Sequence, residues 1–454
     1  MKRPVLFLTT ALLLTAQQNR RPSSENEVFH TVVPAHVYDI TLHRPTATSV
    51  AVTILASQQL DAYIEYGDRK SAMHRIVSGE PVTIPIGGLQ PDTRYSYRLR
   101  YRAPGAATFE SSPEYSFHTQ RKPGAEFTFV IQADSHLDAN VSPQAYESAL
   151  ALMRASNPDF LIDLGDTFMV DKRRTDFHQA LPQYIAQRYY FGLLCHSAPL
   201  FLVLGNHDGE GGARHDGTDG SMAAWSLQLR KRYFPNPRPN SFYSGNPAGD
   251  AVLGPLENYY AWQWGDALFI ALDPFWPTTG RGRQDNWHWT LGDAQYQWLG
   301  KTLANSTAAH KFIFLHHPVG AKGQPIRGGI SAARYNEWGG RNDDDSDGFR
   351  QHRPGWEMPI HQLLAKHHVS AVFHGHDHIY AREELDGIVY QLVPQPGNPR
   401  AGSPRNAQEY GYTTGTVLGA SGHLRVRVTA QKAGVEYVLT KDGSIAHAYS
   451  IPRR

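Results

Sequence analysis

The stretch VSAVFHGHDH, residues 369–378, is the part of the chain from which fold and chemistry are most directly predicted. An apolar run, residues 369–373, ends abruptly in His374-Gly375-His376-Asp377-His378. Two imidazoles at positions i and i+2 of an extended strand point to the same side, roughly 7 Å apart. That spacing suits two neighbouring metal ions better than it suits one. We therefore expect His376 and His378 to face two neighbouring metals, with other apolar runs ending close by.

Four earlier apolar runs also end in carboxylate, imidazole or amide groups. The groups are Asp134-Ser135-His136 after residues 127–133, Gly165-Asp166 after 160–164, Gly205-Asn206-His207-Asp208 after 199–204, and His316-His317-Pro318 after 311–315. Any one of these motifs occurs by chance, but five in this order are hard to produce by chance. In open α/β sheets, ligands bind outside the carboxyl ends of the strands. The five strand ends would therefore direct oxygen and nitrogen ligands at one spot.

Apolar strands alternate with helices from residue 126 onward, which predicts a layered α/β domain over 126–454. Ser142-Pro143 opens a helix as N-cap and first-turn proline. Further helices are expected at 293–303 and 359–368, a core strand at 267–272, and strands of a second sheet at 388–393, 424–428 and 435–439. Two stretches, 209–254 and 321–355, have no regular pattern, and loops of this length are usually functional lids or disordered.

The preceding part of the chain, residues 37–119, is predicted to be all β. Its strand-like runs are separated by turn residues and lie at 37–42, 49–55, 62–66 and 82–86. Pro85 makes the last run an edge strand or an irregular extended segment. The stretch 89–99 alternates after a Pro-Asp turn and resembles the corner of a fibronectin-III-like sandwich, with Tyr95 in the corner position. Since such a module is a general adaptor, we expect it to be structural.

The first residues resemble a secretory signal peptide. Lys2 and Arg3 precede the apolar run 5–16, which ends in the small residue Ala16, although Leu14 makes the cleavage site imperfect. An N-terminal core segment is the alternative. We expect a signal peptide over 1–16, a linker over 17–36 and export from the cytoplasm, to the periplasm or beyond. This run is too short to span a bilayer, and no later run is long enough.

Composition and cysteine content narrow the class of protein. With 41% hydrophobic residues, 19% charged residues and a formal net charge of +2, the chain is an ordinary folded protein. Its basic residues are scattered, so neither nucleic acid nor a membrane surface is expected as a partner. Cys195 is the only cysteine, so no disulfide can form within the chain, and its apolar neighbours predict that it is buried. The sequence leaves the oligomeric state open.

Together, the motifs D-x-H, GD, GNHD, H-x-P and GHDH resemble those of the calcineurin-like metallophosphoesterases. The stretch 375–382, GHDHIYAR, is most similar to the purple acid phosphatase branch, which also carries an N-terminal fibronectin-III-like domain. The resemblance covers residues 37–382. It implies an α/β (α+β) fold, a four-layer sandwich of two mixed β-sheets flanked by helices.

The same resemblance implies an exported enzyme that hydrolyses small or exposed phosphate esters by attack of a metal-bound hydroxide. A phosphomonoesterase is favoured, because the similarity is to the phosphatase branch. A phosphodiesterase of the same superfamily is the alternative. A non-catalytic metal-binding scaffold or binding module is the rival from another class, and it predicts missing ligands.

Family roles carried over by motif give seven metal ligands. The first metal would be held by Asp134, His136, Asp166 and His378, and the second by Asp166, Asn206, His316 and His376, with Asp166 bridging. Only two of the seven are charged, so two divalent ions would keep a net charge of about +2, which attracts phosphate. His316 is preferred to His317 because the family motif is His-x-Pro.

Several neighbouring residues are expected to support this centre. His207 would bind the substrate phosphate or protonate the leaving oxygen, and Asp208 would orient His207 by accepting its other N–H. His317 is expected to face the substrate or to be packed. Asp377 and Asp163 are expected to be structural.

Met169 occupies the position where purple acid phosphatases have a metal-ligating tyrosine, three residues after the GD aspartate. A ferric–tyrosinate centre is therefore not expected, and the metals are predicted to be Fe, Zn or Mn.

The acidic run Asp343, Asp345, Asp347 matches half of a calcium loop, but position twelve is Pro354 instead of glutamate. We interpret it as a solvated acidic loop. Four tryptophans in or near loops either line a substrate cleft or pack the loops: Trp287, Trp289, Trp338 and Trp356.

Overall fold

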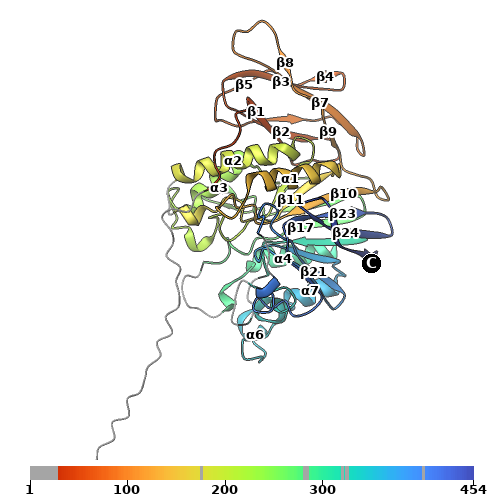
Figure 1. Ribbon diagram of the computed structural model, residues 1–454. Coiled ribbons are helices and arrows are strands. Elements are labelled where there is room, and N and C mark those ends of the chain that lie inside the picture. Colours follow the sequence, from red (N-terminus) through yellow and green to blue (C-terminus); the bar gives the residue numbers. More distant parts are fainter. Residues whose placement is uncertain (1–28, 174–176, 280–285, 319–321, 323–326, 401–403) are drawn as a thin grey trace, which may run out of the picture.

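The computed structural model describes residues 29–173, 177–279, 286–318, 322, 327–400 and 404–454. The predicted signal peptide and part of the predicted linker lie outside these residues. An all-β N-terminal part stands on a layered α/β body (Figure 1). Among the described residues, no helix is both long and apolar enough to cross a membrane.

Two antiparallel sheets form the N-terminal part. One sheet has the order β1-β2-β6, from β1 (Tyr38–His43), β2 (Val50–Ala56) and β6 (Val82–Ile86). The other is built on β3 (Leu60–Tyr66) and β7 (Arg94–Arg102), with the shorter strands β4 (Arg69–Lys70), β5 (His74–Ile76), β8 (Glu110–Ser111) and β9 (Tyr115–His118). Apolar side chains of both sheets pack into one core.

Two details of this part agree with the sequence. β6, which contains Pro85, lies at the edge of its sheet, where a strand can lack one donor N–H. The backbone N–H of Gln90 donates to the Tyr95 hydroxyl at 2.9 Å, the contact that defines a tyrosine corner.

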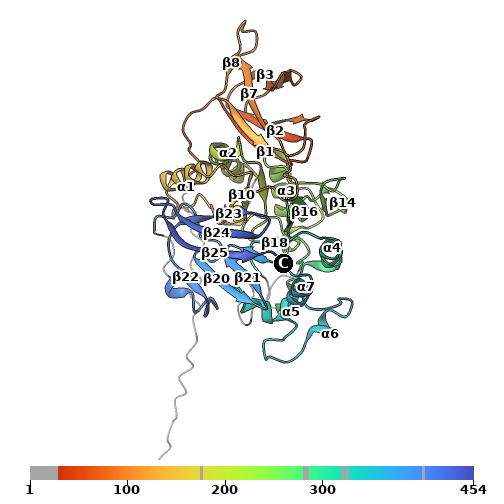
Figure 2. The same ribbon diagram turned by 90° about the vertical axis from the view of Figure 1, so that its right-hand side faces the viewer.

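Arg188 of α2 (Phe177–Cys195) fixes the N-terminal part to the body. Its buried guanidinium lies 2.6 and 2.8 Å from a carboxylate oxygen of Asp39 in β1 and donates to the Thr53 carbonyl in β2 at 2.9 Å. It also donates to the Tyr233 carbonyl of the body at 3.2 Å. Figure 2 shows β1 and β2 lying along α2. The β-sandwich is therefore an integral layer of the structure.

The first sheet of the body has the order β12-β11-β10-β23-β24-β25, and its first three strands run parallel. Its strands are β10 (Phe127–Gln132), β11 (Phe160–Asp163), β12 (Leu200–Leu202), β23 (Gly422–Val428), β24 (Lys432–Leu439) and β25 (Ile445–Pro452). Three helices pack on its outer face: α1 (Pro143–Ala155), α2 and α3 (Met222–Tyr233). As predicted, Ser142 caps α1, since its hydroxyl accepts the N–H of Ala145 at 3.3 Å.

The second sheet has the order β13-β16-β17-β18-β19-β21-β20-β22, with β17, β18, β19 and β21 parallel. Its strands are β13 (Ser244–Gly245), β16 (Tyr260–Trp264), β17 (Ala267–Ala271), β18 (His310–Phe314), β19 (Ala371–His374), β20 (Tyr380–Leu385), β21 (Ile388–Leu392) and β22 (Thr416–Leu418). Its outer face carries α4 (Gly292–Ala304), α5 (Asn336–Gly339) and α7 (Ile360–Lys366), with α6 (Phe349–His352) nearby. Two further strands, β14 (Gly249–Asp250) and β15 (Gly254–Pro255), pair separately from these sheets.

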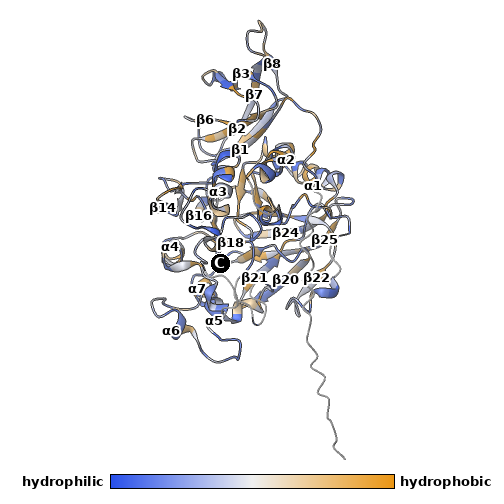
Figure 3. Cartoon of the chain, turned by 90° about the vertical axis from the view of Figure 1, so that its left-hand side faces the viewer, coloured by the Kyte–Doolittle hydropathy of each residue, from blue (hydrophilic) through white to orange (hydrophobic). Residues whose placement is uncertain are grey.

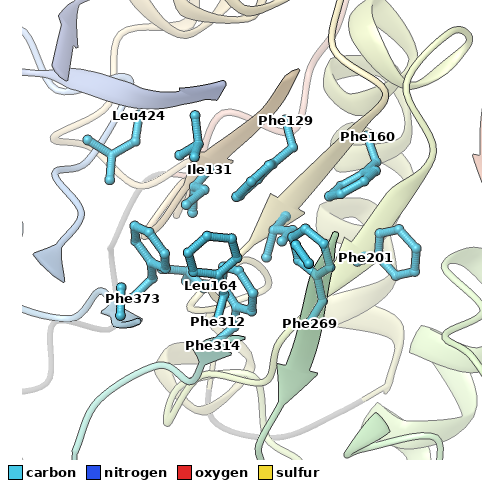
Figure 4. Packing of buried hydrophobic residues seen from close by; sticks show 14 of the residues in the cluster. Phe129, Ile131, Phe160, Leu164, Phe201, Phe269, Phe312, Phe314, Phe373 and Leu424 are labelled. Carbon is cyan, nitrogen blue, oxygen red and sulfur yellow. The ribbon is translucent and has the colours of Figure 1, made fainter. Parts of the chain in front are cut away.

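A core rich in phenylalanine lies between the two sheets (Figure 4). The ring of Phe129 in β10 lies 5.4 Å from Phe160 in β11, and 5.1 and 5.9 Å from Phe269 and Phe312 of the second sheet, between ring centroids. Hydrophilic colouring predominates in the peripheral helices α5 and α6 (Figure 3). The body is thus the expected four-layer sandwich of helices, sheet, sheet and helices.

Two expectations about the elements are wrong. The stretches 209–254 and 321–355 are not irregular throughout, because the first contains α3 and the second contains α5 and α6. The three predicted C-terminal strands do not share one sheet, because β21 joins the second sheet while β23 and β24 extend the first. α2 is not among the helices expected from the sequence. It is buried on several sides, and its buried residues include the polar side chains of Gln183, Gln187 and Arg188. Cys195, at its end, is buried as predicted.

Candidate metal centre

The residues that follow β10, β11, β18 and β19 converge at one end of the two sheets. Six carboxylate and imidazole side chains form two groups, in each of which the potential ligand atoms lie within 4.8 Å of one another. The first group is Asp134, His136 and His378, and the second is Asp166, His316 and His376. Four of the five strand ends identified in the sequence therefore meet in the folded chain, as the parallel strands predict. The fifth, after β12, lies beside them, because the backbone N–H of His207 donates to Asp166 at 2.8 Å.

Asp134 is the centre of the first group. It is fully buried, and its Oδ2 accepts the backbone N–H of His376 at 2.8 Å. Its Oδ1 lies 3.4 Å from His378 Nε2 and 3.6 Å from His136 Nε2. The other nitrogen of His136, Nδ1, lies 3.3 Å from Asp138 Oδ2, so a carboxylate orients this imidazole from behind.

Asp166 has the same role in the second group. Its Oδ1 accepts the backbone N–H of His207 at 2.8 Å, and its Oδ2 lies 3.1 Å from His316 Nε2. His316 Nε2 also lies 3.1 Å from His376 Nδ1, while His316 Nδ1 donates to the Leu164 carbonyl at 2.9 Å. In both groups, one carboxylate oxygen is held by the backbone and the other faces imidazoles.

The two groups adjoin each other and contain buried polar atoms without hydrogen-bond partners among the described residues. His316 Nε2 lies 4.0 Å from Asp134 Oδ1, which links the groups. Four buried polar atoms here have no hydrogen-bond partner in the described part of the chain: Asp134 Oδ1, His136 Nε2, Asn206 Oδ1 and His376 Nε2. Leaving such atoms unpaired costs about 1–3 kcal/mol each. Metal ions would satisfy them, so these residues fit a dinuclear centre with nitrogen and oxygen ligands.

The charges of the groups depend on one another. Burial alone would raise the pKa of Asp134 and Asp166, but the neighbouring imidazoles hold the pKa of both carboxyl groups below its usual range. Burial would lower the pKa of His136 and His316, but the carboxylates raise these values to about 10 and about 9. Without metal, protons on these imidazoles therefore supply the positive charge that the buried carboxylates require.

Five of the predicted ligands have a left-handed backbone, with φ of 59° at Asp134, 43° at His136, 53° at Asp166, 82° at His376 and 58° at His378. Non-glycine residues in this region store strain, and such strain concentrates at functional sites. The expectation that the GHDH motif is extended is wrong, because β19 ends at His374 and the chain then turns. His376 and His378 nevertheless reach different groups.

His207 lies at the edge of the centre and is held by a carboxylate that the sequence did not single out. Its Nδ1 lies 2.8 and 3.0 Å from the two carboxylate oxygens of Asp171, in the 3₁₀-helix Val170–Arg173. Arg214 donates to the same carboxylate at 2.7 Å and to the Asn206 carbonyl at 2.9 Å. Asp171 ends the sequence GDTFMVD, five residues after Asp166. This proximity to a strand end is the feature of the sequence from which its role could have been predicted.

Asp208 does not contact the imidazole of His207, so its predicted orienting role is wrong. Its buried carboxylate accepts four backbone N–H groups, from Gly205 and Asp166 through Oδ2 and from Thr167 and Phe168 through Oδ1, at 2.8 to 3.0 Å. It thereby joins the two loops that carry Asp166 and Asn206. A Cβ at Gly205 would lie 2.0 Å from the Asp166 nitrogen, so the close approach of the loops requires glycine.

Three other residues have structural surroundings. His317 is buried, with ring-centroid distances of 4.7 Å to His376 and 5.3 Å to Phe275, which is the packed alternative. Asp377 is buried, forms an ion pair with Arg327 and accepts the Tyr412 hydroxyl at 2.8 Å. Asp163 bonds within the strand ends, as predicted, to Gly165, Thr167 and Gln132.

Neither group includes Met169, the acidic loop or the four tryptophans. Met169 is buried and has a φ of 47°. In the acidic loop, Asp345 pairs with Lys322 and Tyr335, Asp343 accepts from the Asn286 amide at 3.3 Å, and Asp347 accepts the backbone N–H of Phe349 at 3.1 Å. Of the four tryptophans, Trp287, Trp338 and Trp356 are buried packing residues, whereas Trp289 lines a cleft beside His207.

Comparisons with known proteins agree with this architecture. The sequence model of the family described as calcineurin-like phosphoesterase matches residues 127–380. A solved structure of PhoD is similar at 16% identity and a TM-score of 0.63, with 93% of this chain and 92% of that chain covered. The purple acid phosphatase PPD1 from yellow lupin (Lupinus luteus) seeds is similar at 17% identity and a TM-score of 0.60, with 92% and 74% covered. Identities this low show a shared fold. No curated protein matches the sequence.

Proposed function

The chain belongs to the calcineurin-like phosphoesterases, hydrolases of phosphoric esters, and from this premise we propose that it is an exported dinuclear metal phosphomonoesterase. The observation that carries the proposal is the pair of adjoining groups, Asp134, His136, His378 and Asp166, His316, His376, with the Asn206 amide and His207 beside them. A scaffold without activity would have no need to keep so many strained and unpaired donor atoms.

His207 is proposed as the proton donor to the leaving oxygen. Asp171 holds Nδ1, which fixes the ring and leaves Nε2 for the substrate. A carboxylate behind a proton-transferring imidazole orients the ring. Arg214 in turn fixes the Asp171 carboxylate. The chain thus supplies an acid whose direction is set by two further side chains.

The two groups and Asn206 would hold the metal ions, with Asp166 as the proposed bridge. The ions would supply Lewis acidity toward a phosphoryl oxygen and would lower the pKa of a bound water. Imidazole, carboxylate and amide donors suit Fe, Zn or Mn, and the absence of a phenolate at Met169 argues against a tyrosinate-bound ferric ion. Backbone N–H groups of His376 and His207 hold the carboxylates of Asp134 and Asp166 in place.

The preference for monoesters rests on the resemblance to the purple acid phosphatases, one of which, the lupin PPD1, shares the fold over 92% of this chain. Export rests on the first sixteen residues, whose basic start and apolar core are typical of a signal peptide. Cell fractionation with N-terminal sequencing of the mature protein tests export. A mature chain that retains Lys2 and stays in the cytoplasm would refute it.

Hydrolysis of para-nitrophenyl phosphate against its bis-ester tests the reaction. We expect faster turnover of the monoester, loss of activity after chelation, and recovery with Fe, Zn or Mn. His378→Asn should lose bound metal and activity. His368→Asn is the matched control, because His368 is exposed and has a similar φ of 54°. If neither ester is hydrolysed with any added metal, the proposed function is refuted, and faster turnover of the bis-ester would favour a phosphodiesterase.

A further inference from the structure

A cleft of about 310 Å³ opens beside His207 and the predicted metal ligand Asn206. This volume is at the lower end of the range for small-molecule sites. The lining residues come from three segments that are distant in sequence. The first contributes Asp171, and the third contributes Phe275, Thr278 and Trp289. The second contributes Gly205, Asn206, His207, Glu210, Gly211, Ala213 and Arg214. Because His207 and Asn206 form part of the wall, a substrate whose phosphate lies at the metal centre would extend its leaving group into this cleft.

Two aromatic rings form part of the lining of the cleft. Phe275 and Trp289 meet edge to face, with ring centroids 6.5 Å apart. Phe275 lies 6.2 Å from the predicted ligand His316 and 5.3 Å from His317, and Trp289 lies 6.2 Å from His317, between ring centroids. A continuous series of rings therefore leads from the metal centre to the cleft. Such rings favour a planar aromatic partner in stacked or edge-to-face contact.

The walls of the cleft are fixed by backbone contacts. The N–H of Gly212 donates to the Phe275 carbonyl at 3.2 Å, and the N–H of Ala213 donates to the Thr278 carbonyl at 3.0 Å. A Cβ at Gly212 would lie 2.2 Å from the Trp276 carbonyl oxygen, so the glycine permits this close approach. Arg353 donates to the Trp289 carbonyl at 3.3 Å. The aromatic wall is therefore in place before a ligand binds, which lowers the entropic cost of binding.

The charged side chains of the lining are already paired within the protein. Arg214 lies 2.7 Å from Asp171, and the buried Glu210 lies 2.7 Å from Arg230. A second anionic group on the substrate would find no unpaired cation among these charged lining residues, whereas an uncharged ring would find Phe275 and Trp289. The lining thus favours an uncharged aromatic leaving group.

We infer that the cleft binds the leaving group of aryl phosphate esters, with Phe275 and Trp289 as specificity-determining residues. This inference rests on the proposed phosphomonoesterase function. In the reaction, the bond between phosphorus and the aryl oxygen breaks and a bond between phosphorus and a water oxygen forms. The aryl oxygen takes a proton from His207, which regains one from the attacking water, so the products are a phenol and hydrogen phosphate.

The test compares phenyl phosphate with ethyl phosphate in the metal-loaded enzyme. Trp289→Leu should lower kcat/KM about 10-fold for phenyl phosphate and leave ethyl phosphate nearly unchanged. The ratio between variant and wild type cancels the greater intrinsic reactivity of the aryl ester. Trp289→Phe, which keeps a ring, should restore most of the loss. Trp298→Leu is the control, since Trp298 is also half-buried in the same cluster but does not line the cleft.

Binding of phenylphosphonate and methylphosphonate, measured by calorimetry, gives a readout that does not depend on turnover. Trp289→Leu should weaken phenylphosphonate about 10-fold and leave methylphosphonate unchanged. Equal effects on the aromatic and the aliphatic compound, or no effect on either, would overturn the inference while the phosphatase function stands. If no ester is hydrolysed, the proposed function fails, and the phosphonate affinities still decide the role of the cleft.

Discussion

Replacing Asp208 separates a structural role from a catalytic one. Its carboxylate lies one residue from His207, but it accepts four buried backbone N–H groups and does not contact the imidazole. Asp208→Asn keeps the shape and removes one acceptor oxygen. Whichever way the amide is turned, its NH₂ group faces two N–H donors, from Gly205 and Asp166 or from Thr167 and Phe168.

The magnitude follows from the number of unpaired donors. A buried N–H without a partner costs about 1–3 kcal/mol. Two such groups in Asp208→Asn give about 2–6 kcal/mol, and four in Asp208→Ala give about 4–12 kcal/mol before relaxation. Native proteins are stable by only about 5–15 kcal/mol. We therefore expect Asp208→Asn to unfold at clearly lower urea concentration, and Asp208→Ala to fold poorly.

Asp171→Asn is the matched control, because Asp171 is the carboxylate that contacts His207 and is partly exposed. We expect it to change stability by less than about 1 kcal/mol and to lower kcat by about 10²-fold or more. Urea unfolding, followed by tryptophan fluorescence, and phosphatase kinetics measure the two effects. If Asp208→Asn keeps wild-type stability and loses activity while Asp171→Asn stays active, the assignment of these two carboxylates is reversed.

Three further predictions concern the metal centre and the β-sandwich. Asn206→Ala should lose about one metal ion per chain, as measured by elemental analysis, and should lose activity with it. Full metal content would contradict the proposed second site. Metal affinity should fall as pH falls, about 10-fold per pH unit for each proton displaced, because His136 and His316 bind protons below pKa values of about 10 and about 9. Competition titrations between about pH 6 and 8 measure this, and a constant affinity would refute it. Arg188→Met should lower the free energy of unfolding by about 3–5 kcal/mol, because it leaves the Asp39 carboxylate buried without the guanidinium. If the variant unfolds at the same urea concentration as the wild type, the ion pair between Arg188 and Asp39 does not hold the sandwich on the body.

The convergence of the site could be predicted because strand ends are local features. An apolar run followed by Asp134 or Asp166 marks both the strand and its functional end, and parallel strands bring such ends together. The partner of His207 could not be predicted in this way. Asp171 lies in a 3₁₀-helix whose position depends on packing, while the sequence pointed to the adjacent Asp208. Proximity in sequence did not indicate which carboxylate faces the ring.

The GHDH motif shows where strand periodicity stops being informative. In an extended strand, both imidazoles would project together, but β19 ends at His374 and the left-handed residues His376 and His378 send their rings to different groups. That turn is held by the Asp134 carboxylate, which accepts the His376 N–H, and by the ion pair of Asp377 with a distant arginine. A motif of four residues thus identifies the ligands, whereas their directions are set by contacts made only in the folded chain. For this reason the identity of the ligands can be predicted from sequence more readily than the geometry that binds the metals.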